Sequence, residues 1–174
     1  MKLVVETKIN ASATKAWEVV GEGFADIASW SCGLAQSSLD GELKSGAIRT
    51  CVSAASFGPF EAGTVQEQLT EFDSGRKTFS YQAISGLPGF ISKAQNQWSV
   101  LSRSDKSCVI RFDAEIQFRG FFRPFGIILA PIMKLMMKSD LAKMQEEMIF
   151  RIENGKPHPR NCLLYTSDAA DDSL

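Results

Sequence analysis

The chain has 174 residues, of which 44% are hydrophobic and 22% are charged, and its net charge is −1. This composition is typical of one globular domain, and the near-neutral charge argues against a nucleic-acid partner, which requires a basic face. The only histidine, His158, lies between two prolines after the last predicted helix, so a histidine-based catalytic centre or metal site inside the core is excluded.

The first elements are predicted from alternation and helical spacing. Residues 3 to 9 alternate between two faces, which indicates a strand. Asn10 or Ser12 can then cap a helix, on one face of which lie Ala13, Trp17, Val20 and Phe24. Gly21 and Gly23 should end this helix, and a second short helix should follow and end near Gly33.

The middle of the chain is rich in strand patterns. The segment Asp73-Ser74-Gly75 is a hairpin signal. Cys108 to Phe118 is the clearest strand, because apolar and polar residues alternate along it and predict one dry face and one wet face. The six predicted strands of this region are Ser37 to Leu43, Ala47 to Ala55, Gly63 to Phe72, Thr78 to Ile84, Lys93 to Leu101 and Cys108 to Phe118.

The last predicted helix follows Pro131 and should end at Asn154-Gly155, a typical C-cap pair. Its apolar face comprises Met133, Met137, Leu141, Met144, Met148 and Ile152. The charged residues of this helix are expected to point away from the apolar face; they are Lys134, Lys138, Lys143, Glu147 and Arg151. Methionine adapts to varied apolar shapes, so this face could form the wall of a ligand cavity. A methionine stripe is, however, more often ordinary core.

The four cysteines are far apart and form no C-x-x-C pair, so we expect free thiols and neither a metal nor a cofactor. Residues 1 to 9 have no continuous apolar stretch and do not resemble a signal peptide. The longest uncharged run in the most apolar region, residues 124 to 133, is too short to span a bilayer. These features predict a cytoplasmic protein without a transmembrane segment.

The layout therefore predicts an α+β fold with a curved antiparallel sheet of about seven strands, two short helices and one long C-terminal helix. The amphipathic sheet must cover its dry face, and only the last helix is long enough to do so. A curved sheet around one helix tends to leave a cavity between them, which is a natural site for a ligand.

Several short stretches add a family resemblance. They are Ala16-Trp17 with Trp30 after it, Gly46-Ala47-Ile48-Arg49, Gly63 to Leu69, and Asp73 to Tyr81. Together with the order of elements, they resemble the START-like, Bet v 1-like superfamily, in particular its SRPBCC group of polyketide cyclase/dehydrase and lipid-transport proteins. The resemblance covers residues 1–155 and implies a single domain with the helix-grip fold, followed by a tail at residues 156–174.

The resemblance also implies site residues. Similar members place an Arg and a Glu facing the cavity at positions that match Arg49 and Glu67. These two could anchor a ligand, or move a proton in a cyclisation or dehydration. The alternative is an ion pair that only orients two strands. The other residues expected to bind the ligand are Leu69, Tyr81, Met133, Met137 and Met144, although a half-buried strand tyrosine is usually structural.

Three interpretations of the function stay open from the sequence. The first is binding, for transport or sensing, of a small hydrophobic molecule such as a lipid or polyketide. The alternative is a polyketide cyclase or dehydratase that uses Glu67 and Arg49 without metal or histidine. A third interpretation is transient membrane contact through residues 121–125. The alternative for this segment, which we favour, is a connector buried in the protein. The oligomeric state is not predicted.

The end of the chain is different in kind. Residues 161–174 have no amphipathic period and look like the translated read-through of a sequencing adaptor. The alternative is an ordinary disordered tail. We assign this segment no function.

Overall fold

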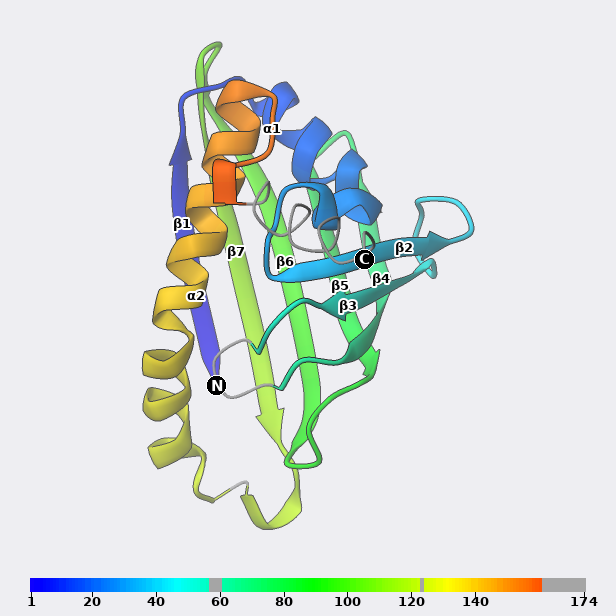
Figure 1. Ribbon diagram of the computed structural model, residues 1–174, viewed down its shortest axis with the longest axis vertical. Helices are drawn as coiled ribbons and strands as arrows, with labels where there is room; N and C mark the ends of the chain where they lie inside the picture. Colours follow the sequence, from blue (N-terminus) through cyan, green and yellow to red (C-terminus); the bar gives the residue numbers. More distant parts are fainter. Residues whose placement is uncertain (57–60, 123, 161–174) are drawn as a thin grey trace, which may run out of the picture.

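The computed structural model describes residues 1–56, 61–122 and 124–160 (Figure 1). Within these residues, the strands are β1 (Lys2–Ile9), β2 (Leu34–Asp40), β3 (Ile48–Ser53), β4 (Thr64–Asp73), β5 (Thr78–Ser85), β6 (Ile91–Ser104) and β7 (Ser107–Phe118). The helices are α1 (Ala13–Val20), the 3-10 helices η1 (Glu22–Ser29) and η2 (Gly120–Phe122), and α2 (Gly126–Asn154).

The seven strands form one antiparallel sheet in the order β1-β7-β6-β5-β4-β3-β2. All neighbouring strands except β1 and β7 are consecutive in the chain. Strands β2 to β7 therefore form a meander, and β1 is added at the edge beside β7. Figure 1 shows α2 running beside β1, with α1 and η1 gathered at one end of the sheet. The predicted α+β architecture of a seven-stranded sheet with a long C-terminal helix is confirmed.

The two short helices join β1 to β2. Ser12 caps α1, because its hydroxyl accepts a hydrogen bond from the Lys15 amide at 3.2 Å. The second helix is a 3-10 helix, since Gly23 and Asp26 adopt non-helical backbone angles and prevent a regular α-helix. The capping prediction for Ser12 is confirmed, and the predicted second short helix is present in 3-10 form.

Helix α2 begins at Gly126, so the predicted start after Pro131 was wrong. Pro131 cannot donate a hydrogen bond to the carbonyl of Ile127. Because Ile127 is highly exposed, solvent can satisfy that carbonyl, and the helix tolerates the proline. At the other end, Gly155 adopts a left-handed conformation with φ 72°, and its amide donates to the Arg151 carbonyl at 2.9 Å. The predicted stop at Asn154-Gly155 is confirmed.

Glu147 corrects the predicted polar face of α2. Its carboxyl group is buried rather than solvated, with 1% of the residue exposed. The Cys32 amide donates to its Oε2 atom at 3.1 Å, and the Cys32 thiol donates to Oε1. Glu147 lies next to Met148, at the margin of the apolar face of α2. The segment that contains Cys32, after η1, packs on this margin and buries the Glu147 side chain.

Two apolar clusters hold the layers together. The larger one lies where α1, η1 and the end of α2 meet the sheet, and it includes Trp17, Phe24, Met148 and Ile152. The smaller cluster lies toward the other end and contains Ile91, Ile116, Phe118 and Met133. Burial of such large side chains is worth about 1.5–3 kcal/mol each, so both ends of the layer contact are anchored. The space between the clusters is the site described next.

The structure tests neither the division into a domain at 1–155 and a tail, nor the adaptor hypothesis, because residues 161–174 lie outside the described part of the chain. None of the helices in the described ranges combines the length and the hydropathy needed to cross a membrane.

Candidate functional site

A cavity of about 710 Å³ lies between the sheet and α2. All seven strands contribute to its lining, together with Ile27 of η1 and the loop between β5 and β6. Helix α2 provides one wall through Met137, Leu141 and Met144. Most of the lining is apolar, and the charged side chains Arg49, Glu67 and Glu61 stand out against it.

Strand register brings the central polar residues into one row. Arg49 of β3 pairs directly with Glu67 of β4, and Glu67 pairs with Ala83 of β5. Successive side chains on a strand point to opposite faces, so Cys51 and Val65, which also pair, share the cavity face. The prediction that Glu67 shares its strand face with Val65 therefore places a carboxylate on the cavity wall.

Arg49 forms hydrogen bonds in two directions. Its Nε and Nη2 atoms both donate to Oε2 of Glu67, at 2.9 and 2.6 Å. Its Nη1 atom donates to the Phe24 carbonyl at 2.6 Å, which ties η1 to the sheet. The Arg49 side chain is 4% exposed and that of Glu67 is 16% exposed. This ion pair is thus buried and geometrically fixed, with Glu67 as its more accessible member.

Aromatic rings enclose the guanidinium. Its central carbon lies 3.7 Å from the centre of the Phe24 ring and 5.1 Å from that of Tyr81. Such stacking favours a cation over an aromatic face. Burial on its own would lower the pKa of Arg49, but the opposing carboxylate of Glu67 outweighs it and the pKa is raised. Arg49 is therefore a permanent positive charge in the cavity wall.

The neighbouring acids stay protonated at neutral pH. Burial raises the pKa of the Tyr81 phenol well above its usual range, and the negative charge of Glu67 adds to this effect. Burial also raises the pKa of the Cys51 thiol, which lies 3.7 Å from Oε2 of Glu67. Tyr81 and Cys51 can accordingly donate hydrogen bonds here, but neither acts as a base or a nucleophile near pH 7.

One carboxylate oxygen is left over. The Nε and Nη2 atoms of Arg49 and the Cys51 thiol all contact Oε2 of Glu67. The second oxygen, Oε1, has no hydrogen-bond donor among the residues that the structure describes. An accepting oxygen that faces an apolar cavity is suited to a hydroxyl or an N–H group of a bound molecule.

The residues predicted from the sequence divide into two groups. Five of them line the cavity: Arg49, Glu67, Tyr81, Met137 and Met144. Leu69 lies instead in the larger apolar cluster, and Met133 packs in the smaller one with Ile116 and Phe118. Their ligand-binding role stays a prediction that the geometry does not favour.

Sequence reasoning missed several lining residues. Asn96, Phe112 and Ala114 of β6 and β7 face the cavity, and Asn96 pairs directly with Ala114. The alternation along β7 already put Phe112 and Ala114 on the dry face, so that signal was available. Asn96 could have been found because it is in phase with Trp98 on its strand.

The loop between β5 and β6 contributes Gly86, Leu87 and Pro88 to the lining. Within the described ranges, no group of three or more acidic, cysteine or histidine side chains is arranged to hold a metal ion.

The chain is similar to known proteins in sequence and in fold. A family model described as polyketide cyclase/dehydrase and lipid transport matches residues 1–148. No curated protein matches the sequence. A norcoclaurine synthase point mutant of Thalictrum flavum, solved with a transition-state analogue, is similar in structure, with a TM-score of 0.68 and 20% identity over 89% of this chain and 95% of that one.

Two bacterial structures are also similar. The ZhuI aromatase/cyclase of Streptomyces sp. R1128 has a TM-score of 0.67 and 12% identity, over 91% of this chain and 99% of that one. A protein of Thermus thermophilus has a TM-score of 0.69 and 10% identity, over 89% and 99%. At these identities the likeness shows a shared fold.

Proposed function

The chain belongs to the polyketide cyclase/dehydrase and lipid-transport family and has its helix-grip fold, and from this premise we propose that it binds a small hydrophobic molecule in the cavity under α2. The apolar body of the ligand lies against Met137, Leu141 and Met144. A polar group of the ligand meets Glu67 beside Arg49. The family resemblance predicted from the sequence is thus confirmed, and the ligand and the roles of these residues are the proposal.

The observation that carries the proposal is the combination of volume and lining. A cavity of about 710 Å³ lies within the usual range for small-molecule sites, roughly 300–1,000 Å³. Its mainly apolar wall favours a greasy molecule, because burial of apolar surface supplies the main driving force. The polar groups are few and fixed, so they orient the ligand rather than supply most of the affinity.

Filling the cavity tests this proposal. Ala114 lies in the lining, so Ala114→Phe should occupy part of the volume. Ala142 lies on the exposed side of α2, which makes Ala142→Phe a matched control. A thermal-shift screen of fatty acids, polyketide-like aromatics and quinones should give stabilising ligands for the wild type and the control, but not for the filled variant. A blank screen together with a native mass spectrum free of bound molecules would contradict the proposal.

A second candidate function is enzymatic, and Oε1 of Glu67 is the observation that favours it. A carboxylate with one uncommitted oxygen could accept a proton from a substrate carbon, while the Tyr81 phenol donates a hydrogen bond to a developing oxyanion and Arg49 stabilises negative charge. The Streptomyces neighbour is an aromatase/cyclase, which makes cyclisation or dehydration the reaction class to assay.

Glu67→Gln separates the two functions. The amide keeps the shape of the carboxyl group and its oxygen still accepts from Arg49, while its NH2 group can donate to a ligand hydroxyl, but it is no longer a base. Loss of turnover with nearly unchanged ligand affinity supports the enzyme. Equal turnover in the variant would remove Glu67 from the mechanism, and binding without any turnover in either form leaves the carrier or sensor. A cytoplasmic location stays a prediction.

A further inference from the structure

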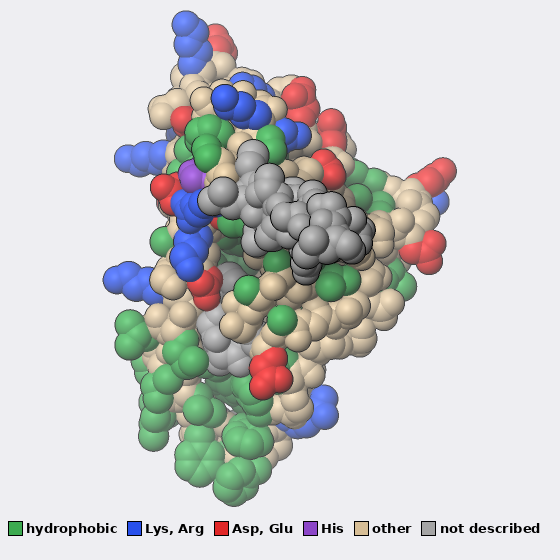
Figure 2. All heavy atoms as spheres, in the orientation of Figure 1, with side chains coloured by type: hydrophobic (Ala, Val, Ile, Leu, Met, Phe, Trp, Pro, Cys, Tyr) green, Lys and Arg blue, Asp and Glu red, His purple; other side chains and the backbone are tan. Residues whose placement is uncertain are grey.

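Aromatic and aliphatic side chains gather on the surface at one end of the molecule, where β7 leads into α2. Figure 2 shows them as a continuous group at the lower end of the view. Phe121, Phe122 and Phe125 are 77%, 44% and 45% exposed, so the predicted buried connector at this position was wrong. The outward side of α2 continues the group with Ile127, Ile128, Ile132, Leu135 and Met136. We call these eight residues the apolar end patch.

The patch departs from the ordinary pattern of a surface helix. Met133 and Met137 already form the buried side of this part of α2. The opposite side should then be polar, yet Ile127 is 87% exposed and Leu135 is 73% exposed. Farther along the same helix, Lys143 and Glu146 occupy exposed positions as expected. An apolar surface of this extent on a helix is normally covered, and none of the residues that the structure describes covers it.

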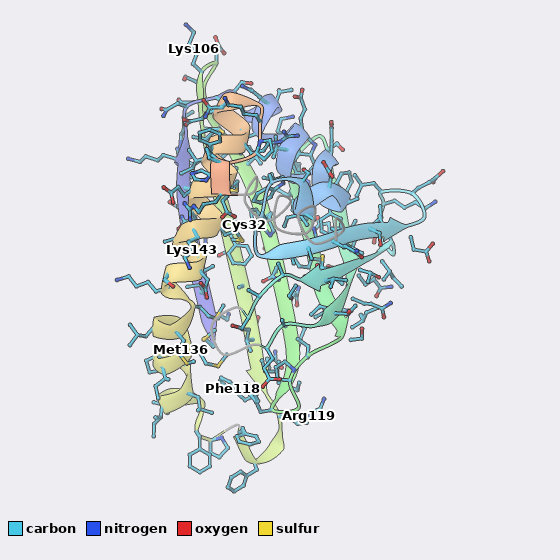
Figure 3. The ribbon with its side chains drawn as sticks, viewed as in Figure 1. Cys32, Lys106, Phe118, Arg119, Met136 and Lys143 are labelled. Carbon is cyan, nitrogen blue, oxygen red and sulfur yellow. The ribbon has the colours of Figure 1, made fainter. Side chains whose placement is uncertain are left out.

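The charges around the apolar end patch indicate which kind of partner binds it. Residues 119 to 139 include four basic residues and no acidic residue. Of these, Lys134 and Lys138 are exposed on α2, and Arg119 is exposed at the end of β7. Figure 3 shows Arg119 next to Phe118, at the same end of the molecule as the first turns of α2. Aromatic and aliphatic groups flanked by lysine and arginine are the composition of surfaces that insert into the interface of an anionic membrane.

We propose that the apolar end patch docks on the surface of a bilayer that contains anionic lipids. The apolar side chains enter the boundary between headgroups and acyl chains, and the flanking cations contact lipid phosphates. A second copy of the chain fits less well, because a two-fold interface brings the same patch onto itself and would set these basic residues against each other.

The patch adjoins the cavity wall. The Phe122 ring packs against Phe90, with 6.1 Å between ring centres, and Phe90 lines the cavity. Leu129 packs in the smaller apolar cluster with Met133 on the inner side of the same helix. Docking would therefore bring the cavity wall next to the lipid, although the docking proposal itself does not depend on what the cavity holds.

The test is flotation with vesicles of phosphatidylcholine and phosphatidylglycerol, compared with vesicles of phosphatidylcholine alone. The test variant is Ile127→Glu combined with Leu135→Glu, since both side chains are largely exposed and glutamate is a good helix former. Leu101→Glu is the matched control, because Leu101 is an exposed apolar residue of β6 toward the hairpin that carries Lys106, at the opposite end of the molecule from Arg119 (Figure 3).

The wild type and Leu101→Glu should float with the anionic vesicles, and the double variant should lose about tenfold or more in bound fraction, because two large apolar side chains no longer transfer into the lipid. A second variant, Lys134→Gln with Lys138→Gln, should bind anionic vesicles more weakly than the wild type does, but bind phosphatidylcholine vesicles equally. Its binding to anionic vesicles should also depend less on salt concentration. Circular dichroism checks that each variant is folded.

Three results would overturn the proposal. They are no flotation of the folded wild type with either vesicle, equal flotation of the wild type and the glutamate double variant, and a wild-type dimer in light scattering that the double variant abolishes.

Discussion

Arg49 is the residue on which the site depends most. It is the more deeply buried member of its ion pair, it bonds both Glu67 and the Phe24 carbonyl, and Phe24 and Tyr81 enclose it. Removing one partner of a buried pair leaves the other charge without compensation. The two members should therefore respond differently to substitution, because the Glu67 side chain is 16% exposed and that of Arg49 only 4%.

We expect Arg49→Met to lower the free energy of unfolding by about 3 kcal/mol or more, since it strands the Glu67 carboxylate and the Phe24 carbonyl. Glu67→Gln should cost about 1–2 kcal/mol, because the amide oxygen still accepts from Arg49. Urea unfolding of the three proteins measures both values. Equal losses in the two variants would show that the pair does not have the asymmetry that its burial suggests.

The thiol of Cys32 gives a prediction on pH. Burial, followed by the hydrogen bond and the charge of Glu147, raises its pKa to about 11. A thiol whose pKa is higher in the folded protein contributes stability below its unfolded pKa, near 9, and that contribution is lost as pH rises through the folded value. The free energy of unfolding should fall between pH 9 and 11.

Cys32→Ser isolates this group, because a hydroxyl still donates to Glu147 but does not ionise in that window. The variant should show a shallower decline than the wild type between pH 9 and 11, measured by urea unfolding at each pH. Parallel curves would mean that the thiol titrates alike in the folded and unfolded chain.

At this scale the sequence predicted the Arg49–Glu67 pair but not the Cys32–Glu147 contact. The first pair followed from the family resemblance, which places both residues on neighbouring strands facing the cavity, and the two residues pair directly in the sheet. The second joins residues that are 115 positions apart. Helical spacing puts Glu147 at the margin of the apolar face, and only the fold decides that the chain after η1 covers it.

For helix α2 the sequence predicted the C-terminal end correctly and the N-terminal start wrongly. Its end was found because Asn154-Gly155 is a local signal. Its start was missed because Pro131 is a strong local breaker, and solvent access to the Ile127 carbonyl is a property of the folded molecule. The inward face from Met133 to Ile152 followed from spacing alone, with Met144 only partly buried.

The loop between β5 and β6 depends on a glycine. Gly86 has φ +79°, and a Cβ atom there would lie 2.2 Å from the Thr64 carbonyl oxygen. We expect Gly86→Ala to destabilise the fold by about 1–3 kcal/mol, since it adds backbone strain to a steric clash. Gly89→Ala in the same loop is the control, because a Cβ atom there meets nothing within 4 Å. Thermal unfolding compares the two, and a similar midpoint for both variants would count against this account.

The cavity is a property of the whole molecule. The two apolar clusters fix α2 to the sheet at separate points, and between them small inward residues such as Ala83, Ala94 and Ala114 leave room that the methionines of α2 do not fill. The sequence predicted that one helix must cover one curved sheet. It could not predict the volume, because that depends on how far the two layers stand apart when both ends are packed.

This arrangement makes the two halves of α2 unequal. Residues 141–154 carry Glu147, Met148 and Ile152, which are almost fully buried in or beside the larger cluster. Residues 126–140 meet only the smaller cluster and the edge of the cavity at Met137, include Pro131 and expose the part of the apolar end patch that lies on α2. Few buried contacts and an interrupted hydrogen-bond ladder both lower the free energy of local opening.

Hydrogen exchange should therefore be about tenfold faster or more for amides in residues 132–140 than for those in 145–154, which corresponds to about 1.4 kcal/mol in opening free energy. Ala114→Phe gives the internal test, since a side chain that fills the cavity supports α2 only around Met137, Leu141 and Met144, before residue 145. It should slow exchange in residues 132–140 and leave 145–154 unchanged. Uniform exchange along α2 in the wild type, or an equal effect of the variant on both halves, would mean that the helix opens as one unit and that the cavity does not weaken its first half.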